Sequence, residues 1–97
     1  MNKALNMIGL ANRAGKIRSG GTLGEKAVKQ GEAYLLIIAE DSSENTKDKF
    51  ISMAKYYETE YALFSTRELL GKFSGGGEKS VLAVLDLGFS EAIKKLL

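Results

Sequence analysis

Two predicted strands, at Ala33–Ala39 and Val81–Asp86, constrain most strongly what this chain can fold into. Each is built on an uninterrupted apolar run, and such runs are typical of central strands that are covered on both faces. Segments with helical spacing precede, separate and follow these strands, so the predicted order of elements is αβαβαβαβα. This order favours an α/β fold in which helices cover both faces of one sheet.

The other predicted elements follow from residue spacing and from capping residues. Residues 2–14 carry apolar side chains at helical spacing, and Gly15 is a typical C-terminal stop. Asp41 and Glu44 have the spacing of a capping box, and Ser90 is the expected N-cap of the last helix. The remaining predicted segments are strands at Lys16–Ser19 and Tyr61–Phe64, helices at Thr22–Gln30, after Glu40–Ser43 and from Ser65 to Gly71, and a flexible loop at Lys72–Lys79.

The composition argues against several classes of function. With 97 residues and no linker or repeat, the chain is expected to form a single domain, residues 1–97, and to be a monomer with its own core. It contains no Cys and no His, which argues against disulfides, thiolate catalysis, zinc sites and the commonest general base. No apolar run approaches the ~18 residues of a membrane span, and no signal-peptide pattern is present. We therefore expect a cytoplasmic protein without a metal, a cofactor or a membrane partner.

Charge is distributed unevenly along the chain. Residues 1–31 hold six basic residues and one acidic residue, which gives a net charge of +5. Residues 32–97 hold eight basic and eleven acidic residues, which gives a net charge of −3. A basic segment of this kind favours a polyanionic partner, of which nucleic acid is the commonest. The alternative is a solvated surface whose lysines only confer solubility.

The segment from Ser19 to Lys26 is the leading candidate for a binding site. Gly20 and Gly21 lie where a short extended piece gives way to a helix, and Lys26 projects from the first turns of that helix. Such a junction offers free backbone N–H groups, a positive dipole end and a nearby cation, which together suit a phosphate group. The alternative is a simple tight turn before the helix. Lys29 is expected on the same outward stripe as Lys26.

Two further motifs do not have the features of a metal or nucleotide site. Glu40-Asp41 follows a central strand, but a divalent cation requires more converging carboxylates, and helix capping explains Asp41. The glycine-rich stretch Gly71–Ser80 precedes a strand rather than a helix, and Phe73 and Glu78 occupy the two glycine positions of a P-loop. This stretch is expected to form a mobile loop beside a binding surface, or a simple solvent loop. Nothing in the sequence indicates an enzyme.

Several short motifs occur in a characteristic order along the chain. They are Leu10–Lys16, Ser19-Gly20, Lys26, the strand Leu35–Ala39 followed by Glu40-Asp41, and Leu70-Gly71. In this order they resemble the ribosomal protein 7Ae/30e family, whose members bind kink-turn and related RNA. The opening segment and Asp86–Phe89 are most similar to the small bacterial paralogues of the YlxQ type. The resemblance covers nearly the whole chain.

The resemblance implies a three-layer α/β/α sandwich around a mixed four-stranded sheet. It also implies that Gly20 lets the protein backbone approach RNA, that Lys26 contacts the RNA, and that the loop Gly71–Gly77 packs on an extruded nucleotide. The two family residues that read sheared guanine–adenine pairs correspond to Thr22 and Leu23. Typical members have Asn or Lys at the first position and Glu or Gln at the second. Because Leu23 cannot hydrogen-bond a base edge, we expect phosphate attraction to persist while kink-turn specificity weakens.

These observations predict a non-catalytic RNA-binding protein that associates with the ribosome or binds another structured, kink-turn-like RNA. Binding is expected at the strand-to-helix junction Gly20–Lys29 and at the loop Lys72–Gly77, with ribosomal proteins as further partners. The alternative is a protein-interaction module on the same fold, since an exposed Leu23 beside a basic edge could dock a protein. The predicted RNA-binding residues are Arg13, Lys16, Arg18, Gly20, Gly21, Thr22, Leu23, Lys26, Lys29, Lys72, Phe73, Ser74 and Gly75.

Overall fold

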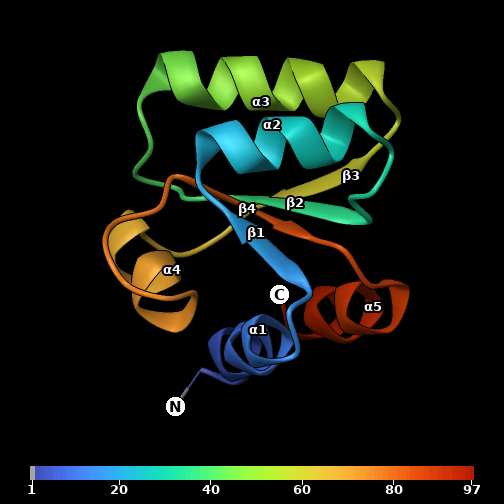
Figure 1. Cartoon of the computed structure of the whole chain (residues 1–97). Coiled ribbons are helices and arrows are strands. Elements are labelled where there is room, and N and C mark those ends of the chain that lie inside the picture. Colours follow the sequence, from blue (N-terminus) through green and yellow to red (C-terminus); the bar gives the residue numbers. More distant parts are fainter. Residues whose placement is uncertain (1) are drawn as a thin grey trace.

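The computed structural model describes residues 2–97 and contains a mixed four-stranded sheet (Figure 1). The strands are β1 (Ile17–Ser19), β2 (Leu35–Ile38), β3 (Glu60–Leu63) and β4 (Val81–Val84), and their spatial order is β1-β4-β2-β3. β4 runs antiparallel to both β1 and β2, whereas β2 and β3 are parallel. The two strands with continuous apolar runs therefore lie at the centre of the sheet, as predicted.

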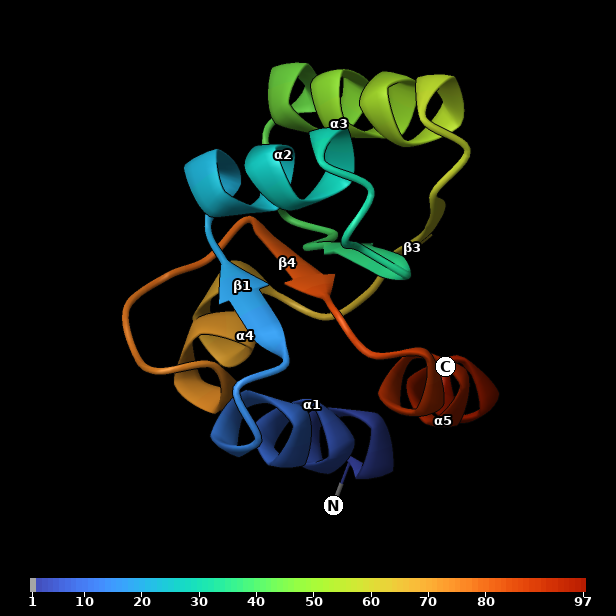
Figure 2. The ribbon, with the colours of Figure 1, turned by 45° about the vertical axis from the view of Figure 1, so that its right-hand side comes forward.

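The helices of the described chain are α1 (Lys3–Arg13), α2 (Gly21–Lys29), α3 (Glu44–Tyr56), α4 (Arg67–Phe73) and α5 (Leu87–Leu96). α2 and α3 cover one face of the sheet, and α1, α4 and α5 cover the other (Figures 1 and 2). This arrangement confirms the three-layer α/β/α sandwich. Within residues 2–97, none of the helices has the length and apolar character needed to cross a membrane.

The alternation of side chains along β2 divides the core into two layers. Leu35 and Ile37 pack with buried residues of α1, α4 and α5, whereas Leu36 and Ile38 pack with buried residues of α2 and α3. All four side chains are at most 1% exposed. A strand that is buried on both faces has no polar positions to alternate with apolar ones, which explains the continuous run in the sequence.

The N-cap of α3 differs from the sequence prediction. The cap is Ser43, whose Oγ accepts a hydrogen bond from Thr46 N at 3.1 Å, and not Asp41. Asp41 Oδ1 instead accepts a hydrogen bond from Arg67 N at 2.8 Å, at the first residue of α4. Asp41 therefore ties the segment after β2 to a helix that lies 26 residues further along the chain.

The N-cap of α5 also differs from the prediction. Asp86 Oδ2 accepts a hydrogen bond from Phe89 N at 2.8 Å, so the helix begins at Leu87, three residues after the end of β4. Ser90, the predicted cap, lies inside the helix and is 1% exposed. A Ser before an apolar stretch looks like a cap in the sequence, but the earlier Asp meets the same requirement one turn sooner.

Gly71 does not end α4 as predicted. The helix continues to Phe73, and the following loop begins at Ser74. The structure gives Gly71 a different role, because a Cβ at this position would overlap the carbonyl oxygen of Gly77. In addition, Gly76 N donates a hydrogen bond to the Gly71 carbonyl at 2.7 Å. The loop therefore packs directly against the bare backbone of α4.

Candidate nucleic-acid interface

Gly20 forms the turn between β1 and α2 in a conformation that favours glycine. Its φ is +95° and its ψ is 164°, so any other side chain would be strained here. Its N–H donates to the Val81 carbonyl at 2.9 Å, which joins the turn to the first residue of β4. Its carbonyl accepts from Gly24 N at 2.9 Å, the first hydrogen bond of the helix. The chain thus passes from strand to helix through a single residue.

The N terminus of α2 presents bare backbone at the surface. In the part of the chain that the structure describes, no side chain caps this end. The N–H groups of Gly21, Thr22 and Leu23 have no intrahelical acceptor, and all three residues are exposed. The partial positive charge of the helix lies at the same end. This arrangement suits an anionic group such as a phosphate.

Lys26 and Lys29 lie on the exposed side of α2, as predicted, but their surroundings differ. Lys29 Nζ forms an ion pair with Glu25 at 2.7 Å, and Glu25 also pairs with Lys49 of α3 at 3.0 Å. The hydrogen bond from Lys29, followed by that from Lys49, lowers the pKa of Glu25, and the same contact with Glu25 raises the pKa of Lys29. Among residues 2–97, no carboxylate lies within ion-pair distance of Lys26. Lys26 is therefore the more available cation for a ligand.

Arg18 and Leu23 extend this surface along the outer strand of the sheet. Together with Lys26 they line part of a hollow of about 230 Å³. Arg18 Nη1 donates to the carbonyls of Gly15 and Ile17, both at 3.3 Å, which holds the guanidinium against the strand backbone. Leu23 is 47% exposed. The apolar residue at this position therefore lies on the surface and shares a hollow with two cations.

The loop between α4 and β4 lies beside the junction because it leads directly into Val81. Its residues Gly75–Gly77 have φ values of +110°, +104° and +71°. A Cβ on any of these three glycines would meet no atom within 4 Å, so this ridge of the loop has open space where side chains would stand. The end of the loop is held by a hydrogen bond from Lys79 N to the Arg67 carbonyl at 3.0 Å. The second predicted contact region therefore also presents backbone rather than side chains.

A strand-to-helix junction with a glycine at the turn, next to a glycine-rich loop before the last strand, is the combination that the sequence resemblance implies. Residues 2–94 match the family described as the ribosomal protein L7Ae/L30e/S12e/Gadd45 family. The chain belongs to this family. Two similar proteins are both named RNA-binding protein YlxQ. The one from Bacillus subtilis (strain 168) is 37% identical over 91 residues, which is 94% of this chain and 91% of the relative. The one from Enterococcus faecium is 38% identical over 96 residues, which is 98% of this chain and 91% of the relative.

Solved structures share the same fold. A protein with unknown function from Bacillus halodurans C superposes with a TM-score of 0.93 and 32% identity, over 99% of this chain and 97% of that one. The Giardia lamblia 15.5kD RNA binding protein superposes with a TM-score of 0.79 and 21% identity, over 95% of this chain and 82% of that one. At this lower identity the second likeness shows the fold alone.

In this L7Ae-family chain, the predicted site residues do not form one surface. Lys16 lies at the opposite end of β1 from Gly20. The Lys16 carbonyl accepts from Leu85 N at 2.8 Å, whereas Gly20 is bonded to Val81 at the other end of β4. Four residues of extended chain at ~3.3 Å each place the two positions about 13 Å apart. The basic N-terminal segment therefore supplies cations to both ends of the strand.

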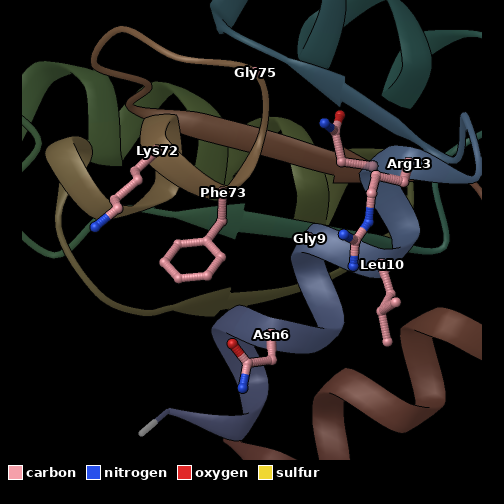
Figure 3. Close-up of a pocket in the computed structure, with 8 residues that line it drawn as sticks. Asn6, Gly9, Leu10, Arg13, Lys72, Phe73 and Gly75 are labelled. Atoms are coloured by element: carbon pink, nitrogen blue, oxygen red, sulfur yellow. The ribbon is translucent and has the colours of Figure 1, made fainter.

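Four predicted residues line a separate groove of about 520 Å³ between α1 and α4 (Figure 3). Sequence reasoning missed the other four lining residues, all on α1, although three of them share helical spacing with a predicted one. Their role depends on the packing of α1 against α4, which local spacing does not reveal. The predicted lining residues are Arg13, Lys72, Phe73 and Gly75, and the others are Asn6, Gly9, Leu10 and Asn12.

Ser74 differs from its neighbours in the predicted loop. It is 5% exposed, and its Oγ donates a hydrogen bond to the Leu70 carbonyl at 2.6 Å. This side chain closes the end of α4 and does not face solvent, so we leave Ser74 out of the interface. Lys72 and Phe73, which were also expected in the loop, form the last turn of α4.

A charged cluster holds the base of the same loop. Arg67 lies 3.7 Å from Asp41 and 3.9 Å from Glu78, in addition to its backbone hydrogen bond to Asp41. This role of Asp41 joins segments that are far apart in the sequence, so no local signal indicated it. Over residues 2–97, no three acidic side chains come together in a way that could hold a metal ion.

Proposed function

We propose that this protein binds structured RNA without catalysis, with the N terminus of α2 against the phosphate backbone. The observation that carries the proposal is the uncapped helix end after Gly20, with Lys26 exposed beside it. The glycine ridge Gly75–Gly77 belongs to the loop that leads into Val81, the residue bonded to Gly20, and it has open space for a nucleotide that has left its helix. Family membership supports the proposal, as do the names of the two YlxQ relatives.

We further propose that kink-turn specificity is weaker here than in typical family members. Leu23 has no hydrogen-bonding group in its side chain, and Thr22 offers only a short hydroxyl. Phosphate contacts position a protein on RNA but carry no sequence information. The proposed ligand is therefore structured RNA in general, with ribosomal RNA as the leading case, and contacts with ribosomal proteins would follow from that location.

The test is a set of mobility-shift titrations with a kink-turn RNA, a plain duplex of equal length and total ribosomal RNA. We expect the wild-type protein to bind all three and to prefer the kink-turn only slightly. Leu23→Glu should sharpen the preference for the kink-turn, because a carboxylate can accept hydrogen bonds from a base edge. The added negative charge should weaken duplex binding at the same time. Unchanged discrimination in both proteins would mean that this edge does not face RNA.

One observation favours a second candidate function, a protein-interaction module on the same fold. Leu23 is a large apolar side chain that is 47% exposed beside Arg18 and Lys26, as expected of a small docking surface. If the folded protein binds none of the three RNAs, this function becomes the better interpretation. Affinity purification with wild-type protein and with Leu23→Ser would then identify the partner that depends on this surface.

A further inference from the structure

We propose that the groove between α1 and α4 is a second binding site, which takes one unstacked nucleotide from a single-stranded extension of the bound RNA. The inference rests on the proposed function, because the extension belongs to an RNA that is held at the N terminus of α2. The groove has a volume of about 520 Å³ and opens to solvent beside the glycine ridge.

The groove offers an aromatic ring to a base. Phe73 is only partly buried, although its inner side packs against the core layer of α1, α4 and α5. Gly9 of α1 lies opposite the ring, and a Cβ at this position would stand 3.5 Å from Phe73 Cδ1. Figure 3 shows Phe73 on α4 and, across from it, Gly9 and Arg13 on α1. Because Phe73 is only partly buried and Gly9 adds no side chain to cover it, part of the ring is accessible from the groove.

The groove also offers positive charge to a phosphate. Arg13 and Lys72 line it from opposite helices, and no acidic residue is among its lining residues in the described chain. Both residues lie in the last turn of their helices, where each helix end contributes roughly −0.5 of a charge. The two full positive charges exceed these two partial charges, so the groove keeps a net charge of about +1. An aromatic ring with nearby cations is the combination that single-stranded nucleic acid sites use.

A continuous path connects the groove to the junction. Gly75 lines the groove, and the loop that contains it ends at Val81, whose carbonyl accepts the Gly20 N–H. Between these points, Gly75–Gly77 expose backbone without any side chain, whereas Glu78–Ser80 carry side chains and Glu78 is exposed. An RNA strand that leaves the N terminus of α2 can follow the loop past these three residues, cross the glycine ridge and enter the groove between Phe73 and Arg13.

The experiment compares one structured RNA with and without a single-stranded tail of roughly eight uridines, attached to either end. A kink-turn RNA serves as the probe, and binding is measured by fluorescence anisotropy as a function of salt. We expect the tail at one end to increase the affinity of the wild-type protein by at least about fivefold, as one stacked base would. The tail should also steepen the salt dependence of log K by about 0.7 for each added phosphate contact.

Three variants of the groove decide where the tail binds. Phe73→Leu removes the ring and keeps an apolar side chain, and Arg13→Gln removes one charge. Gly9→Ala places a methyl group against the ring in an ordinary van der Waals contact and improves helix propensity, so it should fold at least as well as the wild type. Each variant should lose most of the gain from the tail, and Gly9→Ala, which removes no predicted RNA contact, should bind the untailed RNA like the wild type. Lys26→Ala, in contrast, should lower the affinity for the tailed and the untailed RNA by the same factor.

The possible outcomes separate the two proposals. Equal affinity of the wild type for tailed and untailed RNA would overturn the groove assignment and leave the proposed function standing. A tail effect that persists in all three groove variants would also overturn it, because the tail would then bind elsewhere. Failure of the wild type to bind the untailed RNA would overturn the proposed function itself. A tail effect that is lost only in the groove variants supports the second site.

Discussion

The junction at Gly20 and the groove between α1 and α4 lie at the two ends of one loop, but the junction presents backbone groups and the groove presents side chains. The junction presents backbone N–H groups whose direction depends on one glycine with a φ of +95°. The groove presents the side chains of Phe73, Arg13 and Lys72 from two packed helices. We therefore expect substitutions that alter the backbone conformation to weaken RNA binding at the junction. Substitutions that alter the ring or the charges should weaken RNA binding at the groove.

The largest effect is expected for Gly71→Ala, because both sites share the loop that packs on this residue. Replacement of a helical Gly by Ala usually stabilises a helix by about 0.5–1 kcal/mol. Here the new Cβ would overlap the Gly77 carbonyl oxygen, so we expect a loss of roughly 1–3 kcal/mol and displacement of the loop. Urea unfolding and binding of the tailed RNA measure the two effects. Gly9→Ala is the matched control for stability only, and equal stability of the two variants would contradict this packing.

Gly20→Ala should weaken RNA binding more than any other substitution that leaves the loop in place. Gly15→Ala is its control, because Gly15 also has a positive φ, +75°, and also has open space around it. Both changes introduce backbone strain of about 1–3 kcal/mol, which thermal unfolding can measure. Only Gly20→Ala alters the direction of the helix N terminus, so we expect at least a tenfold loss of affinity there and little loss for Gly15→Ala. Similar losses in both would show that general destabilisation is responsible.

A smaller effect separates the two lysines of α2. Lys26→Ala should flatten the salt dependence of log K by about 0.7–0.9, the contribution of one phosphate contact. Lys29→Ala should flatten it less, because Lys29 is already paired with Glu25 at 2.7 Å. Neither change should alter stability by more than about 0.5 kcal/mol. Salt titrations of the single and double variants test this order, and equal slopes in every protein, wild type included, would remove α2 from the interface.

The smallest effect concerns Glu25, which bridges Lys29 and Lys49. Its pKa is lowered in the folded protein, chiefly by the hydrogen bond from Lys29. The stabilisation from Glu25 is therefore present above its unfolded pKa of about 4.3 and is lost as the pH falls through the lower folded value. Glu25→Gln should be slightly less stable than the wild type at neutral pH and equal to it in acid. It should also bind plain duplex RNA more tightly, since two lysines lose their carboxylate. A stability difference that persists below the folded pKa would rule out this ion pair as its source.

The sequence predicted the fold well where the signal is local. The apolar runs at Leu35–Ile38 and Val81–Val84 are buried on both faces, and this double burial removes the polar positions that would otherwise obscure a strand. The turn at Gly20 was equally recognisable, because two adjacent glycines before a helix have few other roles. Both signals are contained within a few residues.

Features that depend on distant partners could not be predicted in the same way. Asp41 has the spacing of a helix cap, yet its partner is Arg67, which only the packing of α4 brings close. Gly71 looks like a helix stop, whereas its requirement comes from contact with Gly77. The groove likewise exists only because α1 and α4 pack together, so Gly9 carried no visible signal. The sequence therefore indicated one half of the candidate surface, and tertiary packing created the other half.

The uncapped end of α2 has a consequence for how such a protein can evolve. The N–H groups of Gly21, Thr22 and Leu23 belong to the peptide chain, so substitutions at Thr22 and Leu23 leave them in place. On the proposed function, the backbone N–H groups determine the affinity for phosphates, and the side chains at positions 22 and 23 determine which RNA is preferred. The two properties can therefore change independently during evolution. Substitutions at these two positions can change the preferred RNA one step at a time, and each successive variant keeps its phosphate contacts and still binds RNA.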